Sequence, residues 1–143
     1  MGLAYPGETA NVRDIMNLAA QYKDAAVELG QGLSKLHRIP QRLLALHSIE
    51  LYLNALLLSK GLDHKAIRDF EHDLGERTRI AVEAGLVLRK RTAAHLATLS
   101  ASREYLIIRY GPELSATLSQ INRVMATLDE LSQKVRRMLR AKS

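Results

Sequence analysis

The chain has 143 residues, of which 47% are hydrophobic and 25% charged, with a formal net charge of +6. This size and composition suit a single globular domain over residues 1–143. The absence of cysteine excludes disulfides, thiolate zinc sites and a cysteine nucleophile. The first ten residues lack the pattern of a secretory leader, and no apolar stretch is long enough to span a bilayer. We therefore expect a cytoplasmic protein without membrane contact.

Apolar residues recur at steps of three and four along most of the chain, which predicts helices. The first predicted helix covers residues 9–29, with Thr9 as its N-cap. The second covers residues 40–60 and ends before Gly61. Because the second helix is apolar nearly all round, we expect it in the middle of a bundle.

The rest of the chain continues this helical pattern. We expect a short helical turn over residues 62–71, followed by helices over 73–85, 88–110 and 113–140. Asp73 and Glu76 have the spacing of a capping box at the start of the third helix. The sequence thus predicts an all-α fold: a single up-and-down antiparallel bundle of five helices. The last helix carries a nearly heptad-like apolar stripe, which favours packing against neighbouring helices or a second subunit and predicts a homodimer.

A polar stripe interrupts the apolar second helix. His47, Glu50 and Asn54 lie three and four residues apart, hence on one helix face. Buried polar groups need partners. The candidate partners are His72 and, from the fourth predicted helix, Arg103 or Arg109. The stripe predicts either a polar pocket, a structural hydrogen-bond network or a face exposed to solvent.

Metal binding is not expected. Di-iron sites in helical bundles use Glu-x-x-His motifs, whereas His47 and Glu50 stand in the reverse order here. We expect no metal and no cofactor.

Three segments resemble the HEPN domain, a family of helical modules associated with nucleotides and RNA. They are LHSIELYLNALLLSKG at 46–61, EHDL at 71–74 and REYLIIRYGPE at 103–113, and the range 46–113 that contains them is about half of the chain. The similarity includes Glu50 and Gly61, the His72-Asp73-Leu74 element and Arg109-Tyr110. The chain departs from the family at Asn54, where Lys is favoured, and at Gly111-Pro112, where Pro follows Tyr directly.

The resemblance implies a HEPN-like core over about residues 10–140 that commonly pairs as a homodimer. It also implies binding of RNA, a nucleotide or a protein partner, as in one half of a toxin–antitoxin-like pair. The candidate binding residues are His47, Glu50, Asn54, His72, Arg103, Arg109 and Tyr110.

Many members of this family are metal-independent endoribonucleases with an Arg followed, after four to six residues, by a His. Arg42 with His47 and Arg89 with His95 both have this spacing. In such a site the guanidinium binds phosphate and the imidazole transfers protons. Arg89 and His95 are the better-placed catalytic candidates, and a solvated basic face with one surface His is the alternative. We favour a non-enzymatic binding module over the endoribonuclease, and a purely structural dimerisation domain stays open.

The C-terminal end, residues 134–142, is basic. It carries Lys134, Arg136, Arg137, Arg140 and Lys142. Such a cluster is typical of phosphate binding, and cations at a helix C-terminus also complement the helix dipole.

Overall fold

The computed structural model describes residues 3–32 and 38–140, so Lys142 of the basic end lies outside the described residues. All regular secondary structure in these two ranges is helical. The elements are α1 (Val12–Gly30), α2 (Arg38–Ser59), α3 (His64–Arg68), α4 (Leu74–Glu83), α5 (Lys90–Ala101), α6 (Glu104–Tyr110), the 3₁₀ helix η2 (Pro112–Thr117) and α7 (Ile121–Arg140). The all-α prediction is therefore confirmed for the part of the chain that is described. No helix in that part has the length and apolar character needed to cross a membrane.

The α2 helix lies at the centre of the fold, as its apolar sequence predicts. It packs against α1, α7, α4, α6 and α3. Its residues Ile49, Leu53, Leu56 and Leu57 are completely buried. Removing this apolar surface from water is the main stabilising contribution of the core.

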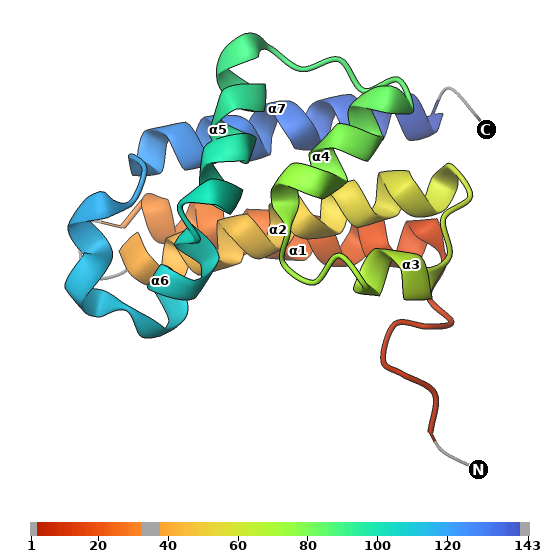
Figure 1. Ribbon diagram of the computed structural model, residues 1–143, viewed down its shortest axis with the longest axis horizontal. Helices are drawn as coiled ribbons and strands as arrows, with labels where there is room; N and C mark the ends of the chain where they lie inside the picture. The colour runs from red at the N-terminus through yellow and green to blue at the C-terminus, as the bar shows by residue number, and fades with distance from the viewer. Residues whose placement is uncertain (1–2, 33–37, 141–143) are drawn as a thin grey trace.

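The helices do not form a simple up-and-down bundle (Figure 1). The α1 and α2 helices make an antiparallel hairpin, but α7 runs in the same direction as α2. The shorter helices α4 and α5 cross over these long helices. The expected antiparallel arrangement of five helices therefore holds for the first two helices and not for the packing of α7 on α2.

The predicted ends of several helices are confirmed. Gly61 and Gly85 adopt φ values of +103° and +115°, a left-handed conformation that favours glycine. Asp73 caps α4 by accepting a hydrogen bond from the Glu76 backbone N–H at 3.0 Å. At α1, by contrast, Asn11 rather than Thr9 is the N-cap, since its side chain accepts the Asp14 N–H at 2.8 Å.

The fourth predicted helix, 88–110, is two helices. The chain leaves α5 at Ser102, and Arg103 adopts a left-handed conformation with φ 55°. This break turns the carboxylate of Glu104 into the protein, where Glu104 is 1% exposed and accepts the Ser119 N–H at 2.6 Å. Without a Pro or Gly at this position, the sequence gives no local sign of the break.

The fifth predicted helix, 113–140, begins only at Ile121 because the preceding segment is held outside it. Pro112–Thr117 form a 3₁₀ turn, and Leu118 is extended. Both backbone groups of Ser119 bond to side chains, its N–H to Glu104 and its carbonyl to the Arg42 guanidinium. Because the N–H and the carbonyl of Ser119 bond to side chains, they are not used for the backbone hydrogen bonds that would extend α7 towards the N-terminus.

The apolar stripe of the last predicted helix is buried only in its middle, since Ile121, Met125 and Met138 are partly buried and Leu114 is 46% exposed. Val124, Leu128, Leu131 and Val135 are between 0% and 1% exposed. The stripe therefore contributes to the core, where α7 packs against α2 and α5. The homodimer stays a prediction.

Candidate nucleic-acid interface

The polar stripe of α2 forms a buried ion-pair cluster around Glu50. The Glu50 carboxylate lies 3.3 Å from His72 Nδ1, 3.9 Å from His47 Nδ1 and 3.9 Å from an Arg77 guanidinium nitrogen. The side chain of Glu50 is 11% exposed and that of Arg77 is 3% exposed. Burial lowers the pKa of His47, although the nearby Glu50 opposes this shift.

Arg77 is the partner that the sequence did not reveal. Its Nε donates to Asn54 Oδ1 at 2.7 Å, and its terminal nitrogens donate to the carbonyls of Ile67 and Asp73. Burial lowers the pKa of Arg77, while Glu50 and Asp73 act in the opposite sense. The spacing within α4 gave no signal of this contact, because Arg77 meets residues that are distant along the chain.

The other expected partners lie elsewhere. Arg103 and Arg109 are both exposed, and neither makes an ion pair with Glu50. Arg109 lies instead over the rings of Tyr105 and Tyr110. Of the predicted set, the structure thus brings His47, Glu50, Asn54 and His72 together, and the arrangement is that of a structural network rather than an open pocket.

His95 belongs to a second buried network, and it is not a surface residue. Its Nδ1 lies 2.7 Å from Thr127 Oγ1, and its Nε2 lies 3.0 Å from Ser119 Oγ. Because the Ser119 hydroxyl donates to Glu104, His95 donates from Nε2 and accepts from Thr127 at Nδ1. Burial, assisted by the charge of Arg123, lowers the pKa of His95 to about 4. The imidazole is therefore neutral at pH 7.

A signal for this burial is present in the sequence. Thr92, His95, Leu96 and Leu99 follow the three- and four-residue spacing of one helix face, and all four are buried. Two leucines on that face place the imidazole on the core side of α5.

Neither Arg–His pair forms a joint site. Arg89 precedes α5 and lines a surface groove, whereas His95 bonds to Ser119 and Thr127 and is not among the groove residues. The Arg42 guanidinium donates to the Ser119 carbonyl, while His47 packs against Tyr22. The spacing of these residues in the sequence therefore does not bring guanidinium and imidazole to one reacting phosphate.

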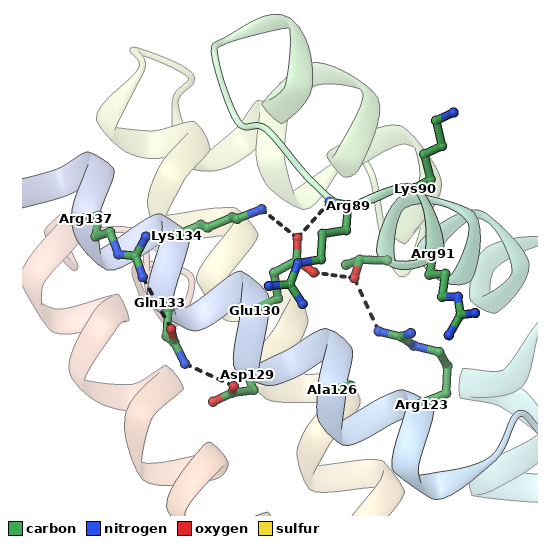
Figure 2. Close-up of a pocket in the computed structure, with 11 residues that line it drawn as sticks. Arg89, Lys90, Arg91, Arg123, Ala126, Asp129, Glu130, Gln133, Lys134 and Arg137 are labelled. Carbon is green, nitrogen blue, oxygen red and sulfur yellow. Dashed lines mark hydrogen bonds and ion pairs between the residues drawn. The ribbon is translucent and has the colours of Figure 1, made fainter.

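The groove between the start of α5 and the exposed side of α7 has a volume of about 480 Å³. Figure 2 shows the side chains that line it, with Arg89 extending over the groove and Lys90 pointing away from α7. The cationic residues around it are Arg89, Lys90, Arg91, Arg123, Lys134 and Arg137, and the acidic ones are Asp129 and Glu130.

Both carboxylates of the groove already have cationic partners. Glu130 accepts from Lys134 Nζ at 2.8 Å and from Thr92 Oγ1 at 2.6 Å, and it also accepts the Arg89 N–H. Burial alone raises the pKa of Glu130, but these hydrogen bonds outweigh it and lower the pKa to about 2. Asp129 pairs with Lys23 at 3.6 Å. The acidic side chains thus leave most of the positive charge uncompensated.

The cationic side chains at the start of α5 have the fewest hydrogen-bond and ion-pair partners in the groove. Within residues 3–32 and 38–140, the side chains of Arg89, Lys90 and Arg91 have no hydrogen-bond or ion-pair partner, and the N-cap residue Arg89 offers no side-chain cap to α5. The N-terminus of α5 itself is already paired, because the Glu130 carboxylate accepts the Arg89 N–H, so the free positive charge is that of the three side chains. Chemically, this arrangement attracts anions with several charges.

No group of three or more His, Asp or Glu residues in the described ranges is arranged to hold a metal ion. Comparisons of the chain with protein-family models, with curated proteins and with solved structures find no match.

Proposed function

We propose that this protein binds single-stranded RNA through the groove between α5 and α7, without cleaving it. The observation that carries the proposal is the set of six cationic residues around the groove, set against two carboxylates that are already paired. Clustered Lys and Arg are the electrostatic footprint of phosphate binding. The overall charge of +6 acts in the same direction by attracting polyanions over longer distances.

The length of the groove favours a strand over a single nucleotide. Its cations on α7 extend from Arg123 to Arg137, which corresponds to about 21 Å along a helix. A chain of several phosphates matches this length better than one nucleotide does. RNA association is also what the resemblance to the HEPN family implies, and a HEPN-like module is part of this proposal.

The alternative of an endoribonuclease using Arg89 and His95 has less support. A catalytic imidazole has to reach the substrate and to titrate near the working pH. His95 is 6% exposed, both of its ring nitrogens are engaged within the protein, and its pKa is about 4. Its role in this proposal is to join α5 to α7.

The test measures fluorescence anisotropy of a labelled oligouridine of about twelve nucleotides over salt concentrations of about 50 to 200 mM. We expect binding that weakens steeply with salt. Replacing Arg89 and Arg91 together by Gln should lower the affinity and reduce the slope of log K against log salt by about 0.7 for each lost phosphate contact.

A matched control replaces Arg13 and Lys65, two exposed cations outside the groove, by Gln. This variant loses the same net charge and should keep most of the affinity. Equal weakening by both double variants would mean that net charge, rather than the groove, governs binding. Shortened RNA in the presence of EDTA would overturn the non-enzymatic part of the proposal.

A further inference from the structure

Four planar side chains gather where α6 meets the segment before α4. The rings of His72 and Tyr105 are stacked, with centroids 4.2 Å apart and an angle of 19° between their planes. The guanidinium carbon of Arg109 lies 5.1 Å from the Tyr105 ring centroid and 4.9 Å from that of Tyr110. We refer to His72, Tyr105, Arg109 and Tyr110 as the planar cluster.

The planar cluster faces solvent on one side and is anchored on the other. Tyr110 is 68% exposed, and the side chain of His72 is 48% exposed. Tyr105 is partly buried against the core, and the buried carboxylate of Glu50 lies 3.3 Å from His72 Nδ1. Two of the four groups are therefore held in position by buried neighbours, while Arg109 and Tyr110 stay accessible.

The backbone on both sides of the stacked pair is constrained. Glu71, directly before His72, has φ 52°, and Arg103, two residues before Tyr105, has φ 55°. They are the two non-glycine residues with positive φ among the described residues. Residues other than glycine adopt this conformation at a cost, and such positions concentrate at binding sites. The pairing of His72 with Tyr105 is thus fixed by the fold rather than by a chance approach of mobile side chains.

The planar cluster lies at the opposite end of α5 from the groove. The twelve residues of α5 correspond to about 18 Å, which is about five steps of a stacked strand. The exposed face of α5 between the two ends is uncharged and small, with Ala94, Ala97, Thr98 and Ala101. A strand bound by its phosphates at Arg91 can follow this uncharged face of α5 towards α6. The carboxylate beside the far end of α5, Asp73, already accepts hydrogen bonds from Ser100 Oγ at 2.8 Å and from the Glu76 N–H at 3.0 Å.

We infer that the planar cluster is a stacking platform for an unpaired base of the RNA strand whose phosphates bind the groove. This inference rests on the proposed function. Aromatic rings and arginine planes bind bases by stacking and cation–π contacts, which tolerate any base sequence. The exposed ring of Tyr110 and the guanidinium of Arg109 supply the open faces, and preorganisation of His72 and Tyr105 lowers the ordering cost of binding.

The test compares two labelled probes of equal length, an oligouridine and an abasic ribose-phosphate strand. The wild type should bind the oligouridine more tightly than the abasic strand. Tyr110→Ala should weaken oligouridine binding about tenfold and leave abasic binding unchanged, because stacking on one base is lost. Tyr110→Phe should restore the affinity, since the ring is kept.

Leu114→Ala is the matched control, because Leu114 is an exposed apolar residue that follows α6 and belongs to no ring contact of the planar cluster. It should leave binding of both probes unchanged. The stacking platform is overturned if the wild type binds the two probes equally and Tyr110→Ala does not weaken binding. If Arg89→Gln and Arg91→Gln do weaken binding in that case, the proposal for the groove still holds. If the wild type binds neither probe, the proposed function fails and the platform fails with it.

Discussion

Arg77 on α4 donates a 2.7 Å hydrogen bond from Nε to the side-chain carbonyl of Asn54 on α2, while one of its terminal nitrogens lies 3.9 Å from the Glu50 carboxylate. The positive charge of Arg77 near Glu50 thus comes from a different helix than the carboxylate. A guanidinium offers several donors in a fixed plane, so it can bond to Asn54 and to two backbone carbonyls at once.

Replacing Arg77 by Met should destabilise the fold by about 3 kcal/mol, because it leaves the buried carboxylate of Glu50 with only histidine partners. Urea unfolding followed by circular dichroism at pH 7 measures this loss. Arg79 on the same helix provides the control, since its ion pairs with Glu76 and Glu83 are exposed. Arg79→Met should unfold at the same urea concentration as the wild type, and equal losses for both variants would contradict a special role of the buried pair.

Replacing Glu50 by Ala should cost about 1–3 kcal/mol, since the change removes the carboxylate that pairs with both His72 and Arg77. Combining it with Arg77→Met should cost less than the sum of the two single changes, because the double variant no longer buries an unpaired charge. The same urea experiments on all four proteins measure this coupling. Strict additivity would mean that Glu50 and Arg77 contribute independently, contrary to the geometry.

The sequence predicts those features that one local segment determines. Gly61 and Gly85 end helices because each takes a backbone conformation that other residues avoid. Asp73 caps α4 with its own side chain. The burial of α2 follows from its apolar residues on every face. In each case the physical cause lies within a few residues of the effect.

The remaining features depend on contacts between distant segments. The break at Arg103 places Glu104 against Ser119, fifteen positions later, and the late start of α7 depends on Arg42 from α2. The groove likewise combines Arg89 and Arg91 with residues from Arg123 onward. A pattern of charges in the sequence shows that cations are present, but only the packing of α5 on α7 shows which of them share a surface.

Leu128→Ala should destabilise the protein by about 3 kcal/mol, because Leu128 is completely buried and the substitution leaves a cavity. If the α7 stripe stabilises a single chain, Leu128→Ala should lose this stability and keep the oligomeric state of the wild type. Thermal unfolding measures the loss, and Val82→Ala, at a site that is 46% exposed, is the control with little expected change. Light scattering on the wild type tests the predicted homodimer, with a mass of about twice 16.0 kDa expected. If Leu128→Ala became monomeric but stayed folded, the α7 stripe would have to form part of the dimer interface.

The buried imidazole of His95 should make stability depend on pH in the acidic range. Its pKa in the folded protein, about 4, lies below the ordinary value of 6.5, so the unfolded chain binds the proton more readily. Stability from this group is therefore complete above about pH 6.5 and declines as the pH falls towards about 4, with a total loss of about 3 kcal/mol. Urea unfolding at intervals between these pH values measures the decline. His95→Gln, which cannot titrate but keeps a donor for Ser119, should flatten the curve of stability against pH over this interval.

The same variant should bind RNA as the wild type does, because His95 lies outside the groove. If His95→Gln lost RNA binding, or lost an RNA cleavage activity that the wild type shows, the imidazole would reach the ligand.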